Sequence, residues 1–408
     1  MASEWRDMTL GDFVALQRGH DLTESQRRLG SVPVMGSAGQ NGYHDTALAK
    51  GPGIVIGRSG ASFGQVHYSP VDFWPHNTAL YVTDFKGNDQ RFAFYFLKAI
   101  NFERYNSGSA QASLNRNFIY PIPVRVPPLS QQKAIAAVLG ALDDKIELTR
   151  RMNATLEAMA RALFQSWFVD FDPVRAKLDG RQPTSMDPAT AVLFPNEFED
   201  SKLGPIPKGW TVLTIGEKLS ILLGGTPSRS ESKYWSNGTV AWINSGKTND
   251  FRIIEPSEWI TEEAVANSAT KRVPARTTVL AITGATLGQV SVTEIECCAN
   301  QSVVAIPMSD EFPTEFTYFW IEENIQQLLA SQTGGAQQHI NTGNVRELKL
   351  LCPQRTVMSA YLAHARPLFD HIAVNCFQSR TLAALRDALL PKLLNGESRI
   401  RRFKDGLE

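Results

Sequence analysis

Two long amphipathic stretches constrain this chain more than any other feature of its sequence. The first covers residues 130–171 and the second covers residues 353–394. In both, apolar residues recur at steps of mostly three and four, the spacing that predicts an amphipathic helix. The two apolar stripes are Ile135, Val138, Leu142, Ile146, Met152, Leu156, Met159, Leu163 and Trp167, and Met358, Leu362, Phe369, Ile372, Cys376, Leu382, Leu385, Leu389 and Leu393.

Helices of this length are too long for the core of one ordinary globular domain. Roughly forty residues span about 60 Å at a rise of ~1.5 Å per residue. We therefore expect the two helices to pair with each other as an antiparallel coiled coil between two globular domains. The alternative is that each stretch forms an independent helical hairpin packed on its own domain.

Short sequence phrases recur in the same order in the two halves of the chain, which indicates a tandem duplication. The order is domain, helix, domain, helix, and the helix ends also align. The matching pairs are residues 5–11 with 210–216, 32–37 with 240–245, 60–66 with 284–290, 92–96 with 316–320, and 110–115 with 336–341.

Each globular half shows a mixed pattern of strands and short helices. Apolar runs bounded by turn residues predict buried strands, and other segments predict short helices and a last strand that ends at proline. The strands are expected at 53–57, 78–82, 119–126, 278–282, 302–306 and 347–351, and the helices at 92–101 and 315–329. Each half is therefore predicted to be α+β, with a twisted, mostly antiparallel sheet.

The predicted fold is an α+β chain in which two such domains are joined by two long antiparallel coiled-coil helices, as a pseudo-twofold tandem repeat. A proline-rich, polar segment connects the first helix to the second domain. The expected divisions are 1–128 for the first domain, 129–171 for the central helix, 172–207 for the connector, 208–352 for the second domain, 353–397 for the C-terminal helix, and 398–408 for a basic tail.

Composition places the chain among ordinary globular proteins. It has 408 residues, of which 43% are hydrophobic and 20% charged. It shows neither an apolar run of about 18 residues nor a signal-peptide pattern, so we expect a cytoplasmic protein without a membrane segment. Its four cysteines lack the spacing of a zinc site or a disulfide framework.

The charge is balanced over the whole chain but not within its parts. There are 41 basic and 41 acidic residues in all. Residues 1–128 contain 12 basic and 10 acidic side chains, whereas residues 206–352 contain 11 and 15. A basic excess is the usual sign of a freestanding DNA-binding protein. If this chain binds nucleic acid, local patches and partner subunits must therefore supply much of the attraction.

Two segments resemble catalytic or nucleotide-binding motifs, but the residues around them do not fit those motifs. Residues 60–64 match G-x-S-x-G, but the next residues predict a strand where a nucleophile elbow needs a helix, so a glycine turn is favoured. Residues 245–248 resemble the end of a phosphate-binding loop, but Ala241 stands where its first glycine belongs. We find no metal-ligand spacing, methyltransferase motif or cofactor loop. The sequence predicts a non-catalytic protein without cofactor or metal.

Polar loops recur in both halves, with side chains that differ between the copies. Arg, Lys, Gln and Asn can make two hydrogen bonds to one base edge, while Ser and Thr suit phosphate oxygens. A shared framework with divergent loops is what two modules recognising different DNA sequences would need; the alternative is that the loops are solvated turns. The candidate DNA contacts are Arg18, Asn41, Gln111, Arg116, Arg229, Lys247, Gln338 and His339.

The chain resembles the specificity subunits of type I restriction–modification systems along essentially its whole length. The resemblance depends on the duplicated architecture and on five phrases in a fixed order. They are Gly-Trp followed by Ile-Gly-Glu at 209–217, Gly-Ala-Ser/Thr-x-Gly-Gln-Val in both halves, the Gly/Ser-x-Gln…Leu/Ile-Asn element, Val-Pro-Pro-Leu-Ser-Gln-Gln at 126–132, and the aromatic-rich run at 164–174. Unlike some members, the chain starts its first domain almost at residue 1, without an N-terminal helical segment.

The resemblance implies a role in DNA recognition. Each domain would read one half of a bipartite double-stranded DNA site, and the helices would set the unread spacer and dock two methyltransferase subunits. Those partners would bind S-adenosylmethionine and methylate adenine at N6, and a further restriction subunit would hydrolyse ATP, move DNA and cut it. The candidate helix residues for partner binding are Ile146, Leu156, Phe164, Trp167, Leu385 and Leu389.

Two rival functions remain at this stage. One is an enzyme, a fused methyltransferase or nuclease with an unrecognised motif, which methylation by the isolated chain would reveal. The other is a tandem protein-interaction scaffold without DNA specificity, which the neutral charge makes plausible. Binding of DNA in the presence of methyltransferase subunits separates the scaffold from the DNA reader.

Overall fold

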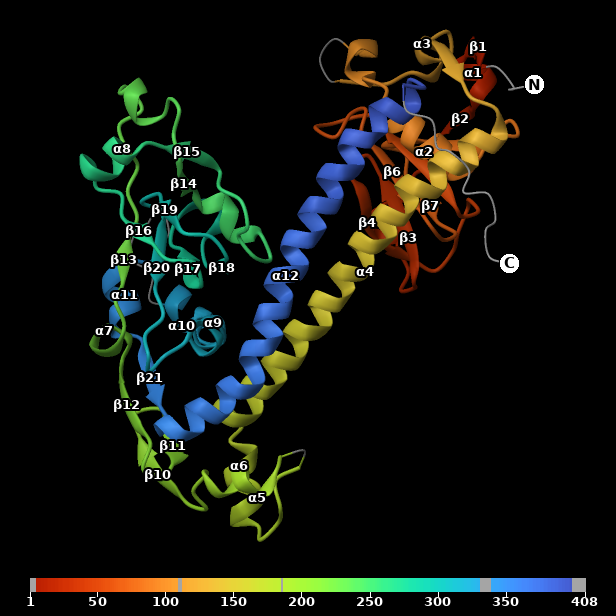
Figure 1. Ribbon diagram of the computed structural model, residues 1–408. Coiled ribbons are helices and arrows are strands. Elements are labelled where there is room, and N and C mark those ends of the chain that lie inside the picture. Colours follow the sequence, from red (N-terminus) through yellow and green to blue (C-terminus); the bar gives the residue numbers. More distant parts are fainter. Residues whose placement is uncertain (1–4, 109–111, 185, 331–338, 398–408) are drawn as a thin grey trace, which may run out of the picture. The chain divides into compact units, whose positions relative to one another are not determined.

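The computed structural model describes residues 5–108, 112–184, 186–330 and 339–397 (Figure 1). The chain divides into two compact units. The first unit contains the chain up to Glu147 together with the segment from Thr381 onward, and the second unit runs from Leu148 to Arg380. Each unit combines a sheet-containing domain with part of the long helix α4 (Leu129–Phe168) and part of the long helix α12 (Arg355–Leu394). Both predicted long helices are therefore confirmed.

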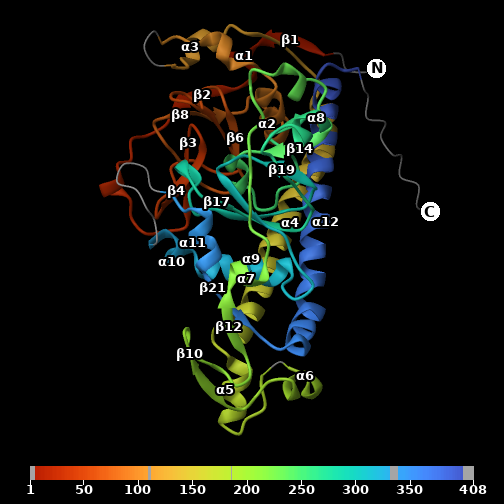
Figure 2. The same cartoon turned by 90° about the vertical axis from the view of Figure 1, so that its left-hand side faces the viewer.

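Within each unit the two helices lie side by side and run in opposite directions (Figure 1 and Figure 2). In the second unit, the rings of Trp167 and Tyr361 lie 6.0 Å apart, and Asn375 donates a 2.8 Å hydrogen bond to Asn153. In the first unit, Arg386 donates a 2.6 Å bond to Asp143. As the residue number falls along α4 it rises along α12. The pairing is antiparallel, as predicted, and the alternative of independent hairpins is not observed.

The buried seam of α4 differs from the apolar stripe that the sequence predicted. Thr149 and Asn153 are buried, whereas Met159 is 53% exposed. From Thr149 to Trp167 the buried positions recur at steps of four or three, the spacing of a coiled-coil seam. Several seam positions are polar, so a stripe drawn through apolar residues alone misses them.

The domain of the first unit contains two small sheets and a separate strand pair. The first sheet is antiparallel, whereas the second also has a parallel pair between β3 (Val32–Gly36) and β7 (Trp74–Pro75). The first sheet has the order β2 (Ala15–Arg18), β8 (Ala79–Asp84), β5 (Gly53–Gly57), β6 (Val66–Ser69); the second has β4 (Gly39–His44), β3 (Val32–Gly36), β7 (Trp74–Pro75); and β1 (Arg6–Thr9) pairs with β9 (Pro123–Val126). The helices are α1 (Leu10–Phe13), α2 (Gln90–Lys98) and α3 (Arg116–Ile119), with 3-10 turns at Glu24–Gln26 and Phe102–Tyr105.

The domain of the second unit repeats this plan. One sheet is antiparallel, and in the other the parallel pair is β14 with β19. The orders are β13 (Leu222–Leu223), β20 (Val303–Ile306), β17 (Thr277–Ala281), β18 (Val290–Thr293), and β15 (Glu258–Ile260), β14 (Val240–Ile243), β19 (Cys297–Ala299), β16 (Arg272–Val273); β12 (Thr211–Thr214) pairs with β21 (Lys349–Cys352). The helices are α7 (Ile215–Lys218), α8 (Glu262–Ala266), α9 (Thr314–Glu323), α10 (Ile325–Ala330) and α11 (Thr342–Glu347), with 3-10 turns at Ser232–Tyr234, Ser245–Asn249 and Gly284–Thr286.

The duplication extends to the register of the strands. Ile56 faces Leu80 across β5 and β8, and Leu280 faces Val304 across β17 and β20. The turn that follows the inner strand closes through glycines with positive φ in both copies, 85° at Gly60 and 75° at Gly284. Such backbone angles favour glycine because other residues would place a Cβ against the chain. The predicted glycine turn is thus confirmed, and a strand, β6, follows it where a nucleophile elbow would need a helix.

Three segments differ from their predicted form. The helix expected at 315–329 is interrupted at Asn324, between α9 and α10, and Ile119 ends α3 instead of beginning a strand. The connector contains secondary structure of its own, namely α5 (Asp172–Leu178), α6 (Pro188–Val192) and the hairpin of β10 (Phe198–Ser201) with β11 (Gly204–Pro207). Its side chains Val174, Phe194 and Ile206 are buried in the core of the second unit.

Each domain shares its hydrophobic core with the paired helices. In the first unit, Phe13 and Phe92 are buried in one cluster with Leu139 of α4 and Leu393 of α12. In the second unit, Phe164, Trp167 and Phe168 of α4 are buried in one cluster with Phe316 of α9, Trp210 and Tyr361 of α12. Fully burying one such side chain contributes roughly 1.5–3 kcal/mol. The cores therefore fix each domain firmly to its part of the helix pair.

Candidate nucleic-acid interface

A hollow of about 650 Å³ in the first unit brings together two of the predicted DNA contacts, Arg18 and Arg116. Arg18 ends β2 and Arg116 begins α3, so the chain places them together from positions far apart in sequence. A third arginine, Arg58, follows β5 and lines the same hollow. The wall is mostly polar and consists of Gln17, Arg18, Gly19, His20, Asp21, Arg58, Leu80, Ser107, Ser113, Leu114, Asn115, Arg116 and Asn117.

The three arginines are held by different groups. Arg116 donates a 2.9 Å bond from Nη1 to the carbonyl of Leu16, and Arg58 donates a 3.2 Å bond from Nε to the carbonyl of Asn77. Arg18 lies 3.8 Å from the carboxylate of Asp21. Among the described residues, Arg58 and Arg116 have no carboxylate partner, so the hollow keeps an excess of positive charge.

Burial and like charge act on Arg58 in the same direction. Removal from water lowers the pKa of its guanidinium, and the nearby charge of Arg18 lowers it further, while Asp21 raises it. An arginine nevertheless stays protonated at neutral pH. A partly buried guanidinium with two terminal nitrogens turned to no acceptor in the described chain suits a planar ligand with paired acceptor atoms.

The predicted contacts of the second domain already have partners within the unit. Arg229 makes a two-pronged contact with Glu258, with both distances 2.7 Å, and its guanidinium lies 3.6 Å from the ring centre of Trp235. Lys247 pairs with Asp250 at 2.9 Å. His339 forms a bridge with Thr283 beside the glycine turn. Direct DNA contact by Arg229 or Lys247 would first require these ion pairs to rearrange.

The other predicted DNA contacts lie elsewhere. Asn41 is exposed on β4, and its side chain and carbonyl both accept hydrogen bonds from Arg27. It does not line the hollow with Arg18 and Arg116. Gln111 and Gln338 lie outside the described residues. The sequence analysis missed Arg58, although aligning the glycine turns of the two copies sets it against Ile282 and would have singled it out.

Two of the six residues predicted to bind partner subunits are buried instead. Phe164 is 1% exposed and Trp167 is 4% exposed, because both lie in the core that holds the second domain on α4. Neither side chain has surface to offer a partner. Of the others, Leu385 is 47% exposed, while Ile146, Leu156 and Leu389 are half-buried along the helix pair. Their contact with partner subunits stays a prediction.

A second hollow, of about 830 Å³, lies beside the helix pair in the second unit. It opens between the end of α4, α5 and α12, and it was not singled out by the sequence. Apolar side chains such as Met159, Leu163 and Leu368 line it together with charged ones such as Arg175 and Asp187.

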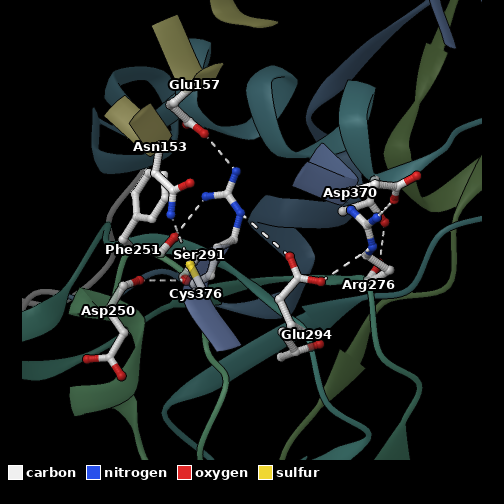
Figure 3. Close-up of polar contacts among 12 residues, drawn as sticks. Asn153, Glu157, Asp250, Phe251, Arg276, Ser291, Glu294, Asp370 and Cys376 are labelled. Atoms are coloured by element: carbon white, nitrogen blue, oxygen red, sulfur yellow. Dashed lines mark hydrogen bonds and ion pairs between the residues drawn. The ribbon is translucent and has the colours of Figure 1, made fainter. Parts of the chain in front are cut away.

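An ion cluster, buried around Arg252 and Glu294 and exposed at Asp370, connects the second domain to both helices (Figure 3). The side chain of Arg252 is fully buried; its Nη2 lies 2.7 Å from Oε2 of Glu157 on α4, and its Nε lies 3.7 Å from Oε1 of Glu294. Arg276 then pairs with Glu294 at 3.4 Å and with Asp370 on α12. Burial raises the pKa of Glu294, against the lowering effect of both arginines.

Aromatic rings enclose the buried guanidinium. The rings of Phe251, Tyr318 and Phe369 have their centres 4.7, 4.9 and 5.0 Å from the Arg252 guanidinium carbon. In the first unit, Arg91 of α2 pairs with Asp144 of α4 at 2.6 Å, and both side chains are more exposed than Arg252 and Glu157. The second domain is thus fixed to its helices by buried charge as well as by its apolar core.

The described residues contain neither a cluster of metal-binding side chains nor a membrane-spanning helix. No group of three or more His, Cys, Asp or Glu side chains there could hold a metal ion. No helix in the same ranges has the length and apolar character needed to cross a membrane.

Comparison with known proteins identifies the duplicated domain. The family model of the type I restriction modification DNA specificity domain matches twice, at residues 2–158 and 207–356. The HindI specificity subunit of Haemophilus influenzae is 26% identical over 317 residues, covering 68% of this chain and 69% of that protein. The MjaIX specificity subunit of Methanocaldococcus jannaschii is 25% identical over 323 residues, covering 76% and 70%.

A solved structure supports the fold. The type I restriction–modification S subunit from M. genitalium aligns with a TM-score of 0.60 over 96% of each chain, at 16% sequence identity. The family model matches each of the two domains once. This agrees with the tandem repeat seen in the strand registers. The chain belongs to the type I restriction–modification DNA specificity family, as its sequence led us to expect.

Proposed function

We propose that this chain recognises a bipartite DNA site on behalf of a type I restriction–modification complex, with each domain reading one half. The observation that carries the proposal is that two copies of a DNA specificity domain share one framework but differ on their surfaces. The hollow with Arg18, Arg58 and Arg116 in the first domain suits acceptor groups of DNA. The relatives are named specificity subunits, which argues for a non-catalytic role and against a scaffold without DNA specificity.

The helix pair would set the number of unread base pairs between the two half-sites. Each long helix has 40 residues, which corresponds to about 60 Å. One turn of DNA is ~34 Å long, so a strut of this length can serve half-sites in successive turns. Rigid attachment of both domains to the helices, through shared cores and the Arg252 cluster, supports this role.

Catalysis would come from partner subunits. We propose that two methyltransferase subunits dock on the helices and methylate adenine at N6, and that a restriction subunit with ATP-dependent activity joins through them. The exposed side chain of Leu385 and the hollow beside Met159 are surfaces of the helices that could receive a partner. The family supports assembly in such a complex.

Selection from random duplexes tests the proposal. The chain, combined with its methyltransferase subunits, is incubated with a library of double-stranded DNA, and the bound fraction is sequenced. We expect two constant blocks separated by a spacer of constant length and free sequence. The methyltransferase subunits alone serve as the control. Bound DNA without any shared sequence would favour the scaffold alternative and contradict DNA reading.

A further inference from the structure

The matching strand registers allow the arginine hollow of the first domain to be compared position by position with the second domain. Arg18 faces Leu80 across β2 and β8, and Leu223 faces Val304 across β13 and β20. Leu80 and Val304 are themselves equivalent, because each faces the same position of the inner strand. Leu223 therefore occupies the place of Arg18.

The same comparison places Ile282 at the position of Arg58. The carbonyl of Arg58 accepts a 2.8 Å hydrogen bond from the amide of Leu114, and the carbonyl of Ile282 accepts a 3.0 Å bond from the amide of Ile340. Each residue directly follows the inner strand of its sheet, β5 or β17, and precedes the glycine turn. Ile282 is 5% exposed, so the second domain closes this position with an apolar side chain.

The third arginine is also absent from the matching position. Arg116 is the first residue of α3, after the capping residue Asn115. Thr342 is the first residue of α11, after the capping residue Asn341. The equivalents of the three arginines are thus a leucine, an isoleucine and a threonine, on an otherwise conserved backbone plan.

Three arginines around one hollow repel one another, so the arrangement favours a bound acceptor group. Arg58 is the least exposed of the three, and its Nε is held by the carbonyl of Asn77. That bond orients the guanidinium and leaves Nη1 and Nη2 to act as a pair. Paired nitrogens match two acceptors in one plane, such as O6 and N7 of guanine, or two oxygens of a phosphate.

We propose that Arg58 is the central DNA-contacting residue of the first domain, and that the second domain recognises its half-site without an equivalent contact. The inference rests on the proposed function. It places two coplanar acceptor atoms of DNA in the half-site that the first domain reads. Arg18 and Arg116, which line the same hollow, strengthen the contact. The unequal charge of the two domains, with 12 basic and 10 acidic residues in 1–128 against 11 and 15 in 206–352, agrees with this asymmetry.

The test uses the full chain in complex with its methyltransferase subunits and a duplex bearing the site that the wild-type complex selects. Arg58→Ile introduces the side chain that the second domain has at the equivalent position, Ile282. We expect it to weaken binding roughly 10- to 100-fold, the loss typical of one two-pronged base contact. Arg125→Ala is the matched control, because Arg125 is 69% exposed in the same domain and does not line the hollow.

Two further measurements distinguish a guanine from a phosphate. If Arg58 contacts guanine, Arg58→Ile removes the preference at one base pair of the first half-site, and Arg58→Lys does not restore it, because lysine lacks the planar fork. If Arg58 contacts a phosphate, all sequences weaken alike, the slope of log affinity against log salt falls by about 1, and Arg58→Lys restores much of the binding.

Equal affinity of Arg58→Ile and wild type at both half-sites would overturn the inference, as would a base preference lost only in the second half-site. If Arg58→Ile does not fold, the double variant Arg18→Leu with Arg116→Thr decides, since both side chains are exposed. Loss confined to the first half-site supports the inference, and no loss refutes it. A wild-type complex without any sequence preference would instead refute the proposed function itself.

Discussion

Arg252 carries a charge that is buried inside the second unit. A fully buried guanidinium is tolerated only when its charge is compensated, and Glu157, Glu294 and three aromatic rings provide that compensation. Its partners come from the second domain, from α4 and, with the ring of Phe369, from α12. The cluster therefore couples the position of the domain to the helix in a way that apolar packing alone, which tolerates small shifts, does not.

Removal of one partner of this cluster should be costly. Glu157→Ala leaves Arg252 buried without its nearest carboxylate, and loss of one partner of a buried pair typically costs ~3–5 kcal/mol. Chemical denaturation, followed at the unfolding transition of the second unit, measures the change in the free energy of unfolding. Glu258→Ala removes the exposed partner of Arg229 and should cost less than about 1 kcal/mol. Equal losses of stability in the two variants would show that the buried cluster stabilises the fold no more than an exposed ion pair does.

The contact between Arg91 and Asp144 should stabilise the folded state by an amount that depends on pH. The hydrogen bonds from Arg91 lower the pKa of Asp144 below its ordinary value of 3.8. A lowered pKa in the folded state means that the stabilisation is present above pH 3.8 and is lost as the pH falls through the lowered value.

Asp144→Asn tests this dependence. At neutral pH we expect it to reduce stability by less than about 1 kcal/mol, since the pair is partly solvated. Below the lowered pKa the wild-type carboxyl is itself protonated, so the difference should vanish. Urea denaturation of both proteins over a range of acidic pH measures the difference, and a penalty that grows as the pH falls would contradict the assignment.

At the scale of the elements, the helix seam is specified by polar as well as apolar residues. Asn153 of α4 and Asn375 of α12 are both buried and joined by a 2.8 Å hydrogen bond. A buried amide pair in a coiled coil fixes register, because any shift leaves both amides without partners. This pair lies within the second unit and holds the antiparallel alignment there.

A double-mutant cycle tests the amide pair. Asn153→Leu or Asn375→Leu alone removes the hydrogen bond between the two side chains and leaves the other amide buried without it, which should cost ~1–3 kcal/mol. The double variant removes both amides and should regain much of that loss, so the two effects are not additive. Thermal or urea denaturation of the four proteins measures the coupling. Additive losses would mean that the pair does not act as a unit.

The sequence predicted the helices and the inner strands well, for physical reasons. Period 3.6 is visible over forty residues, and the apolar run at Gly53–Gly57 has few alternatives to a buried strand. The helix α3 was missed because it has only four residues and depends on the cap at Asn115. Phe164 and Trp167 were assigned to partners because a sequence shows that a side chain is apolar but not which surface covers it.

The candidate site was only partly predictable. Arg18 and Arg116 were chosen from polar loops, but their convergence depends on tertiary structure, because β2 and α3 are nearly a hundred residues apart. Arg229 and Lys247 were chosen by the same rule, and only the structure reveals their carboxylate partners Glu258 and Asp250. Side-chain type predicts capacity to bind DNA, whereas availability depends on neighbours that are distant in sequence.

At the scale of the whole molecule, duplication supplies two DNA specificity domains and two helices from one ancestral plan. Because the strand registers agree while the surfaces differ, each domain can change its target without disturbing the fold. Each long helix contributes residues to both units. In the proposed function, the helices set the number of base pairs between the two half-sites.

A matched insertion tests this spacing role. One heptad inserted after Thr149 of α4 and another after Ser379 of α12 keep the antiparallel seam in register, since the Asn153–Asn375 pairing sets these positions opposite each other. Seven residues add ~10 Å, about three base pairs of DNA. Sequencing of the duplexes selected by the complex should show a longer spacer and unchanged half-sites. Altered half-site sequences would contradict the division of labour between helices and domains.

Mapping methylated adenines in genomic DNA from cells with and without this gene tests whether the two domains read two half-sites. If two domains read two half-sites, the methylation that depends on the gene will fall in one bipartite motif, with two specific blocks and an unread spacer of fixed length. A single uninterrupted motif, or a methylation pattern that does not change when the gene is removed, would contradict the account.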